Sequence, residues 1–365
     1  MNVLSAQPVD RDLVLDFWRG VGILMVIAHH LFYFHFSAFR IFAASVPIGA
    51  FEQILWWANQ VLIGFSERAG PWGVKFFFIV SGYIITLLVL REEEKYGRLR
   101  IGTFYVKRLF RILPPYLFYL FGISIFAALS WVALPSSDVL TAGAFLCNTV
   151  LPCGWFVVHT WTLAIEMQFY LVWPIFFIIL PVRHRCLFLT ILLAVLYICS
   201  AFGVFVTRGW IDNALSFSCI VLGALCALYP NLRAMLQKYG FWYIGAIIFI
   251  IGSVYLFGFG EVARVIYRIT TPIVLTALIF STYQYKRLIR SWVFTAVASI
   301  GLVSYSLYLW QQVFLAPSEQ YLSPSILQNF LFMIVCCLFS YYAVEKPFIR
   351  LKKSFLERYA FRAKV

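Results

Sequence analysis

The sequence predicts an all-α integral membrane protein with about ten transmembrane helices and both termini in the cytoplasm. Of its 365 residues, 63% are hydrophobic and only 12% are charged, and the mean hydropathy is +0.88. Apolar stretches of roughly 18 or more residues, each long enough to cross ~30 Å of hydrocarbon, recur along nearly the whole chain. The basic residues are also divided unevenly between alternate loops. These features leave no room for a separate soluble domain.

Each predicted helix is an apolar stretch bounded by polar or basic residues. The ten spans are 13–35, 71–90, 112–134, 163–181, 187–206, 212–229, 241–258, 264–282, 293–315 and 325–344. They form one domain over residues 1–365, with a basic cytoplasmic tail at 345–365. Residues 46–65 contain Glu52 and Asn59, so we expect an interfacial helix there. Residues 139–151 are too short to span and are expected to be interfacial or re-entrant.

The distribution of basic residues gives the orientation. With the N terminus inside, 23 of the 29 Lys and Arg residues fall on the cytoplasmic side. The other side holds Arg40, Arg68, Lys75, Arg208, Arg264 and Arg268. Basic loops facing anionic lipid account for the net charge of +14, so we expect membrane lipid as a partner and no nucleic acid. The N-terminal segment lacks the pattern of a cleaved signal peptide, and the first span should be retained.

The first span carries ionisable groups that lipid contact does not require. Arg19 and His30 are eleven residues apart, which places them on one helix face roughly 16 Å from each other. A buried imidazole is a functional candidate, because such groups usually face a partner or a substrate path and can accept a proton near neutral pH. The alternative is a structural histidine bonded to a neighbouring helix. His29 points elsewhere, but a small helix rotation would exchange the two rings.

Two further segments carry charges at suggestive positions. Arg108 and Arg111, in KRLFRILPPY, are one helical turn apart at the cytoplasmic mouth of the third span. They could clamp a phosphate, or they could simply be the arginines of a cytoplasmic loop. Glu166, in HTWTLAIEMQFYLVWP, enters its span from the outer surface at a depth similar to that of His30. We therefore expect its carboxylate to orient the His30 ring.

The cysteines indicate little chemistry. Cys147 and Cys153, in CNTVLPC, fall in a predicted outer loop, where an oxidising compartment could join them or leave them free. The other six lie in or beside spans and are expected to be apolar fillers. No pattern of residues indicates a metal site.

Four separated segments together resemble the acyltransferase-3 family of integral membrane acyltransferases. They are LDFWRGVGILMVIAHH, WGVKFFFIVSGYII, FYVKRLFRILPPY and HTWTLAIEMQFYLVWP, and two weaker matches, IGLVSYSLYLW and VEKPFIR, follow. Each segment alone is a weak pattern, but their order and spacing over residues 15–350 make the joint match fairly specific.

The resemblance implies an enzyme of the bacterial inner membrane that acetylates polysaccharide or related molecules. It would take an acyl group from cytoplasmic acetyl-CoA, or another acyl-CoA, and deliver it to a hydroxyl of a glycan or lipid-linked saccharide on the other side. Arg108 and Arg111 would hold the coenzyme A phosphates, with Arg19 assisting. His30 would be the base or acyl-handling group, and Glu166 its partner or an acceptor-site residue. No metal is expected.

This chain departs from the family pattern at Lys75 and Gln311, which we expect to lie away from the residues just named. Many relatives carry a fused esterase-like domain, which we expect to be absent because the chain ends at Val365. A transporter or flippase of a lipid-linked saccharide is the alternative, and a scaffold subunit a third, although neither requires a coenzyme A site. The acceptor, the acyl group, direct transfer against an acyl-enzyme, and the oligomeric state stay open.

Overall fold

The computed structural model describes residues 12–35, 50–203, 206–207, 211–256, 260–317, 322–323 and 325–362 of the chain. Almost all of these residues are helical, which confirms the predicted fold class. The helices are α1 (Leu13–His35), α3 (Ala50–Tyr96), α4 (Ile101–Ala128), α5 (Ser136–Gly143), α6 (Trp155–Val158), α7 (Trp161–Ile179), α8 (Val182–Ala201), α9 (Asn213–Leu228), α10 (Pro230–Leu256), α11 (Gly260–Ser281), η1 (Thr282–Gln284), α12 (Lys286–Ile289), α13 (Trp292–Phe314), α14 (Ile326–Phe339), the π-helix η3 (Ser340–Glu345) and α15 (Lys346–Arg362). A small antiparallel ribbon pairs β1 (Val206–Thr207) with β2 (Ile211–Asp212).

Among the described residues, eight helices are long and apolar enough to cross a membrane. Each of these eight overlaps one of the ten predicted spans. The predicted span 212–229 corresponds to α9, which has 16 residues and bends by 105° into the start of α10. Counting that bent pair as one broken span gives nine. The predicted span 241–258 begins inside α10, and its last two residues lie outside the described residues.

Several helix boundaries differ from the prediction. Residues 46–49 lie outside the described residues, and from Ala50 one helix runs through Pro71 to Tyr96, so residues 50–65 do not form a separate helix. Their position at the membrane interface stays a prediction. Polar side chains do not interrupt a helix, and proline is tolerated within membrane helices. α4 begins at Ile101, well before the predicted 112, and the predicted tail continues as a helix to Arg362. The segment 139–151 contains only the end of α5, which is too short to span.

Close helix crossings position the central helices. α1 packs between α3 and α13, and α9 packs against α3. A Cβ added at Gly20 would lie 2.1 Å from the Val297 carbonyl oxygen of α13. One added at Gly82 would lie 2.0 Å from the Ile220 carbonyl oxygen of α9. Only glycine permits such close approach of helix backbones, which is how membrane helices commonly associate.

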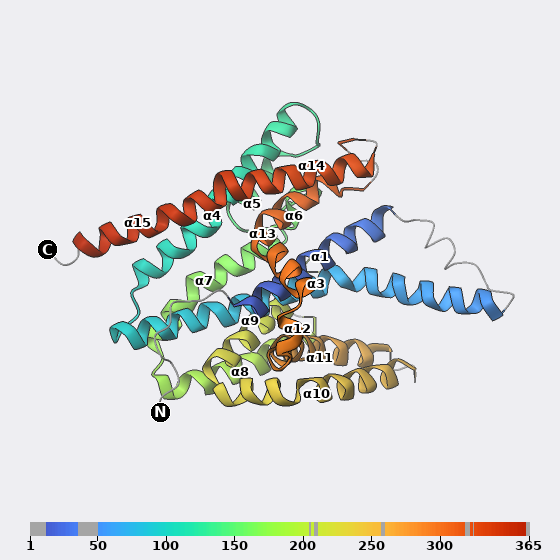
Figure 1. Ribbon diagram of the computed structural model, residues 1–365, viewed down its shortest axis with the longest axis horizontal. Helices are drawn as coiled ribbons and strands as arrows, with labels where there is room; N and C mark the ends of the chain where they lie inside the picture. The colour runs from blue at the N-terminus through green and yellow to red at the C-terminus, as the bar shows by residue number, and fades with distance from the viewer. Residues whose placement is uncertain are drawn as a thin grey trace.

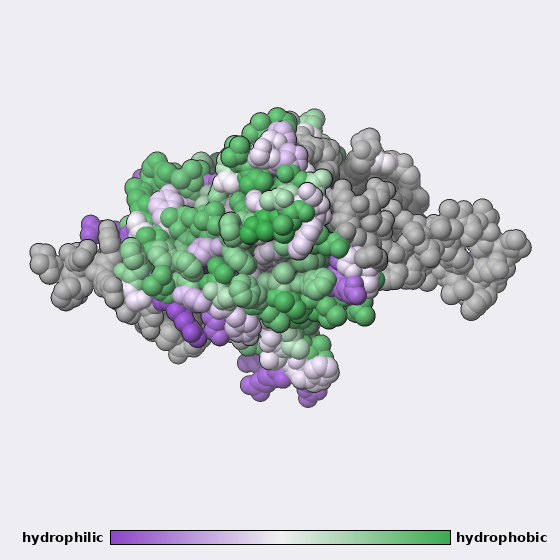
Figure 2. Space-filling model, turned by 90° about the horizontal axis from the view of Figure 1, so that it is seen from above, coloured by the Kyte–Doolittle hydropathy of each residue, from purple (hydrophilic) through white to green (hydrophobic). Residues whose placement is uncertain are grey.

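The periphery of the molecule is apolar. In Figure 1, α1 and α3 run through the middle, with α4, α14 and α15 on one side and α8, α10 and α11 on the other. Figure 2 shows a face that is mostly hydrophobic, with hydrophilic residues gathered in small patches. Large side chains such as Leu117, Phe121, Leu171 and Ile179 are between 56% and 71% exposed. Apolar surface on this scale indicates contact with lipid.

Candidate active site

Three adjoining cavities run through the centre of the helical bundle. The first, which we call the arginine cavity, has a volume of about 60 Å³ and is lined by Arg19, Arg108, Arg111 and Glu166. The second, the middle cavity, is also about 60 Å³. The third, the histidine cavity, is about 420 Å³ and is lined by His30. The first two share Arg19, Phe77, Glu166 and Tyr305, and the last two share Val74, Phe78 and Tyr308. A path of cavities therefore joins the arginines to the histidine.

The arginine cavity collects cations from two helices. Arg108 and Arg111 come from one face of α4, and Arg19 comes from α1. Arg108 is buried, and its Nε has no hydrogen-bond partner among the residues that the structure describes. Its guanidinium lies 5.9 Å from the centre of the Phe104 ring and 6.0 Å from that of Tyr170. Three guanidinium groups that line one cavity, one of them buried, favour an anionic ligand, because such charge is costly to leave unpaired.

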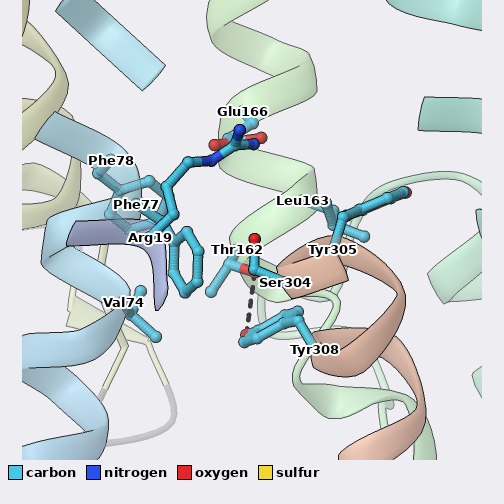
Figure 3. Close-up of a pocket in the computed structure, with 10 residues that line it drawn as sticks. All are labelled: Arg19, Val74, Phe77, Phe78, Thr162, Leu163, Glu166, Ser304, Tyr305 and Tyr308. Atoms are coloured by element: carbon cyan, nitrogen blue, oxygen red, sulfur yellow. Dashed lines mark hydrogen bonds between the residues drawn. The ribbon is translucent and has the colours of Figure 1, made fainter. Parts of the chain in front are cut away.

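Glu166 lies with the arginines and not with His30. It lines the arginine and middle cavities together with Arg19, whose guanidinium is directed toward it (Figure 3). Its Oε2 accepts a hydrogen bond from the Tyr170 hydroxyl (3.2 Å). The expected contact of Glu166 with the His30 ring is thus wrong. The short helix α6 and a turn precede α7, and this turn carries His159. His159, and not Glu166, therefore lines the histidine cavity with His30.

His30 is held by a residue that the sequence analysis placed away from it. The His30 Nδ1 lies 2.6 Å from Gln311 Oε1, and the Gln311 Nε2 donates to Gln312 Oε1 (3.3 Å). Because an amide oxygen only accepts, Nδ1 is the donor in this contact, and in a neutral ring Nε2 then carries the lone pair. Gln311 is one turn beyond Tyr308 on α13, so both face the cavity. The expectation that Gln311 lies apart from the site was wrong.

The other departure from the family pattern also reaches the site. Lys75, from α3, lines the histidine cavity, and its Nζ donates to the Pro71 carbonyl oxygen (3.4 Å). Asp212 and His29 line the same cavity. The His29 ring packs so closely against α3 that a Cβ at Gly70 would lie 2.7 Å from it. The structure therefore keeps both histidines at this cavity, and Lys75 is not remote from them.

His159 is a candidate that the sequence analysis missed. Its ring is buried, lines the histidine cavity, and lies edge-on to Tyr119 and Tyr308, with ring centres 5.4 and 5.5 Å away. Neither ring nitrogen makes a hydrogen bond among the described residues, although the Leu309 backbone lies near the ring. The available signal was its place in HTWTLAIE, seven residues before Glu166.

A disulfide closes the loop that leads into Trp155, a residue lining the histidine cavity. Cys147 and Cys153 are joined, with their Cα atoms 5.7 Å apart, which resolves the alternative left open by the sequence. The next residue after Cys153 donates its N–H to Asp138 Oδ2 (2.6 Å). Trp155 follows, and its ring lies 5.6 Å from that of His30. Its Nε1 donates to the Gln312 carbonyl, and its own carbonyl accepts from Gln312 Nε2, both at 3.0 Å. This loop therefore fixes one wall of the cavity beside His30.

Metal ligation is not indicated by the site. Among the parts of the chain that the structure describes, no group of three or more His, Cys, Asp or Glu side chains is arranged to hold a metal ion. The ionisable groups that line the path are three arginines and a glutamate at one end and three histidines, Lys75 and Asp212 at the other. An anion site and an acid–base site are the functions that these residue types support.

Comparison with known proteins identifies the family. Residues 12–344 match the family described as an acyltransferase domain. A proposed peptidoglycan O-acetyltransferase of Bacillus subtilis, YrhL, is 26% identical over 91% of this chain and 54% of its own length. A proposed O-acetyltransferase of Staphylococcus aureus is 24% identical over 76% of this chain and 52% of its own length.

The peptidoglycan O-acetyltransferase OatA of Listeria monocytogenes is 26% identical over 45% of this chain and 24% of its own length. The chain thus spans about half the length of the first two of these curated relatives. No solved structure matches it. Because the family match covers nearly the whole described sequence, the chain belongs to the acyltransferase-3 family.

Proposed function

We propose that this protein is a membrane-bound O-acyltransferase that moves an acyl group, in the first instance acetyl, from acyl-CoA to a hydroxyl of a glycan or lipid-linked saccharide. The observation that carries the proposal is the path of three cavities, with three arginines at one end and His30 at the other. Donor and acceptor would approach from opposite ends. The relatives named above as peptidoglycan O-acetyltransferases support a glycan acceptor.

The arginine cavity is the proposed donor end. Coenzyme A carries phosphate groups, and guanidinium groups bind phosphate through paired, charge-assisted hydrogen bonds. Arg108 and Arg111 share a helix face, so both can reach one ligand. Arg19 links this cavity to the middle cavity, where a thioester extending from the phosphates would pass Glu166 and Tyr305. Arg19 thus assists donor binding. The proposed role of Glu166 is to position Arg19, and not to position His30.

His30 is the proposed base at the acceptor end. With its proton on Nδ1, the ring can take the hydroxyl proton of the acceptor at Nε2 as the acceptor oxygen attacks the thioester carbon. The carbonyl π electrons move to the carbonyl oxygen and then return as the C–S bond breaks. The departing thiolate takes the proton from His30, which restores the ring. Attack by Nε2 itself would give an acyl-histidine and ping-pong kinetics.

Two observations support the orientation of this path. Basic residues concentrate in loops on the predicted cytoplasmic side, where Arg108 and Arg111 begin their span. The disulfide of Cys147 and Cys153 lies two residues before Trp155, which lines the histidine cavity, and disulfides form in oxidising compartments. We therefore place the donor end in the cytoplasm and the acceptor end outside the bacterial inner membrane.

Binding of acetyl-CoA to the purified protein, measured by calorimetry, tests the donor assignment. We expect saturable binding that is lost when Arg108 and Arg111 are both replaced by Gln. The matched control replaces Lys95 and Arg98, which are exposed and line none of the three cavities, by Gln and removes the same charge. Equal loss of acetyl-CoA binding in both variants would mean that Arg108 and Arg111 act only through their charge and form no specific donor site. No binding at millimolar acetyl-CoA by folded wild-type protein would favour the transporter.

A further inference from the structure

His159 occupies a position for which a structural role gives no account. The side chain is 4% exposed, and a neutral imidazole buried there has one N–H donor and one acceptor nitrogen. Neither is used within the described residues. Buried polar atoms are nearly always hydrogen-bonded, so an exception that lines a cavity beside His30 indicates a ligand atom. A side chain that only fills space would more readily be an apolar ring such as that of phenylalanine.

The backbone at His159 is held by hydrogen bonds, although its ring nitrogens make none. The Tyr308 hydroxyl donates to the His159 carbonyl oxygen (3.0 Å) and accepts from the Thr162 hydroxyl (3.0 Å), a contact drawn in Figure 3. The Tyr119 hydroxyl is bonded to the carbonyl of Phe156 in the preceding turn. Together with the two tyrosine rings that flank it, these bonds fix the direction of the imidazole. Catalytic hydrogen-bond donors are held in this preorganised way.

The neighbouring polar groups of the cavity are already engaged. Gln311 bonds to His30 and to Gln312, and Gln312 bonds to Trp155. Asp212 accepts from the Leu215 N–H and from Ser200. The His159 ring lies edge-on to two tyrosine rings, and its nitrogens bond to no acidic side chain, so an imidazole N–H is available to donate.

We infer that His159 donates a hydrogen bond to the carbonyl oxygen of the acyl group while His30 accepts the proton of the acceptor hydroxyl. This inference rests on the proposed acyltransferase function. When the acceptor oxygen adds to the thioester carbon, the carbonyl oxygen gains the electron pair of the π bond. The His159 N–H stabilises that charge and keeps its proton throughout, so the ring is unchanged when the C–S bond breaks. The two histidines thus have separate roles, one as the base and one as the oxyanion donor.

The test uses the 365-residue chain, in liposomes for the infrared readout and in cell membranes for the kinetic one, with two substitutions at the site. His159→Phe keeps a planar ring and removes both nitrogens, whereas His159→Gln keeps an N–H donor. The control is His184→Phe, at an exposed histidine of α8. One readout is the infrared frequency of the thioester carbonyl of acetyl-CoA carrying ¹³C at that carbon. The other is the rate of thiol release from acetyl-CoA in membranes of the expressing cell.

We expect the carbonyl band to move to lower frequency on binding to the wild type and to the control, and not to His159→Phe. The kcat of His159→Phe should fall roughly 100- to 1,000-fold, the loss typical of one oxyanion donor, with KM for acetyl-CoA nearly unchanged. His159→Gln should recover part of kcat and of the band shift. A folded His159→Phe protein with the wild-type band and kcat would overturn the inference. Wild-type protein that neither binds nor turns over acetyl-CoA would overturn the acyltransferase proposal itself.

Discussion

Replacing Gln311 with Met should slow acyl transfer about 10- to 150-fold without changing the affinity for acetyl-CoA. Gln311 Oε1 accepts from His30 Nδ1 at 2.6 Å, and this bond becomes charge-assisted once Nε2 has taken the acceptor proton. Hydrogen bonds to charged groups contribute about 1.5–3 kcal/mol. At about 1.4 kcal/mol for each tenfold in rate, losing this bond in the transition state gives the stated range. Met has similar length, so the buried volume is nearly kept.

The assay is kcat for thiol release from acetyl-CoA, with donor binding measured by calorimetry on the same preparations. Gln311→Glu keeps an oxygen acceptor for Nδ1–H and should retain more activity than Gln311→Met. Gln312→Met removes the neighbouring amide while leaving the bond to His30, and it separates the tautomer effect from a general change in the wall beside Trp155. A folded Gln311→Met protein with wild-type kcat would refute the argument that this bond sets the His30 tautomer.

The remaining predictions concern the base, the helix packing and the disulfide. His30→Ala should abolish acyl transfer yet bind acetyl-CoA normally in calorimetry; retained transfer would remove His30 as the base. Gly82→Val should sharply reduce the yield of folded protein in size-exclusion chromatography, because its Cβ would lie 2.0 Å from a carbonyl oxygen of α9. Gly102→Val is the control, since a Cβ there would meet nothing within 4 Å, and its yield should be unchanged. Equal yields of the two variants would contradict the close crossing of α3 and α9. Replacing Cys147 and Cys153 by Ser should lower the free energy of unfolding by about 2 kcal/mol, the value expected for a disulfide that closes so short a loop. The midpoint of thermal unfolding should fall with it, and an unchanged midpoint would contradict this prediction.

Much of the fold could be predicted because membrane helices follow from hydrophobic length alone. The span at 13–35 coincides with α1 for this reason. Boundaries where hydropathy and backbone differ could not be predicted in this way. The helix over 50–96 continues through Pro71, and α4 extends eleven residues beyond its predicted start, because polar residues can prolong a helix beyond the apolar part.

The site was predicted in its residue types but only partly in its contacts. One-dimensional spacing correctly placed Arg108 and Arg111 on a shared face, since both line one cavity. Spacing along the sequence does not give the relative depths of two helices, so the prediction paired Glu166 with His30. In the structure, the break between α6 and α7 places His159 beside His30 in the histidine cavity. Contacts between distant segments, such as Gln311 with His30, depend on how helices rotate against one another and leave no local pattern.

In the proposed reaction, donor and acceptor meet from opposite faces of the membrane. The direct test supplies radiolabelled acetyl-CoA outside inverted membrane vesicles, whose cytoplasmic face is exposed, and outside right-side-out vesicles. We predict that label reaches glycan enclosed in the inverted vesicles, that right-side-out vesicles stay unlabelled, and that replacing Arg108 and Arg111 by Gln prevents labelling. Equal labelling of both kinds of vesicle, or label only on molecules on the same face as the donor, would contradict transfer through the path from the arginines to His30.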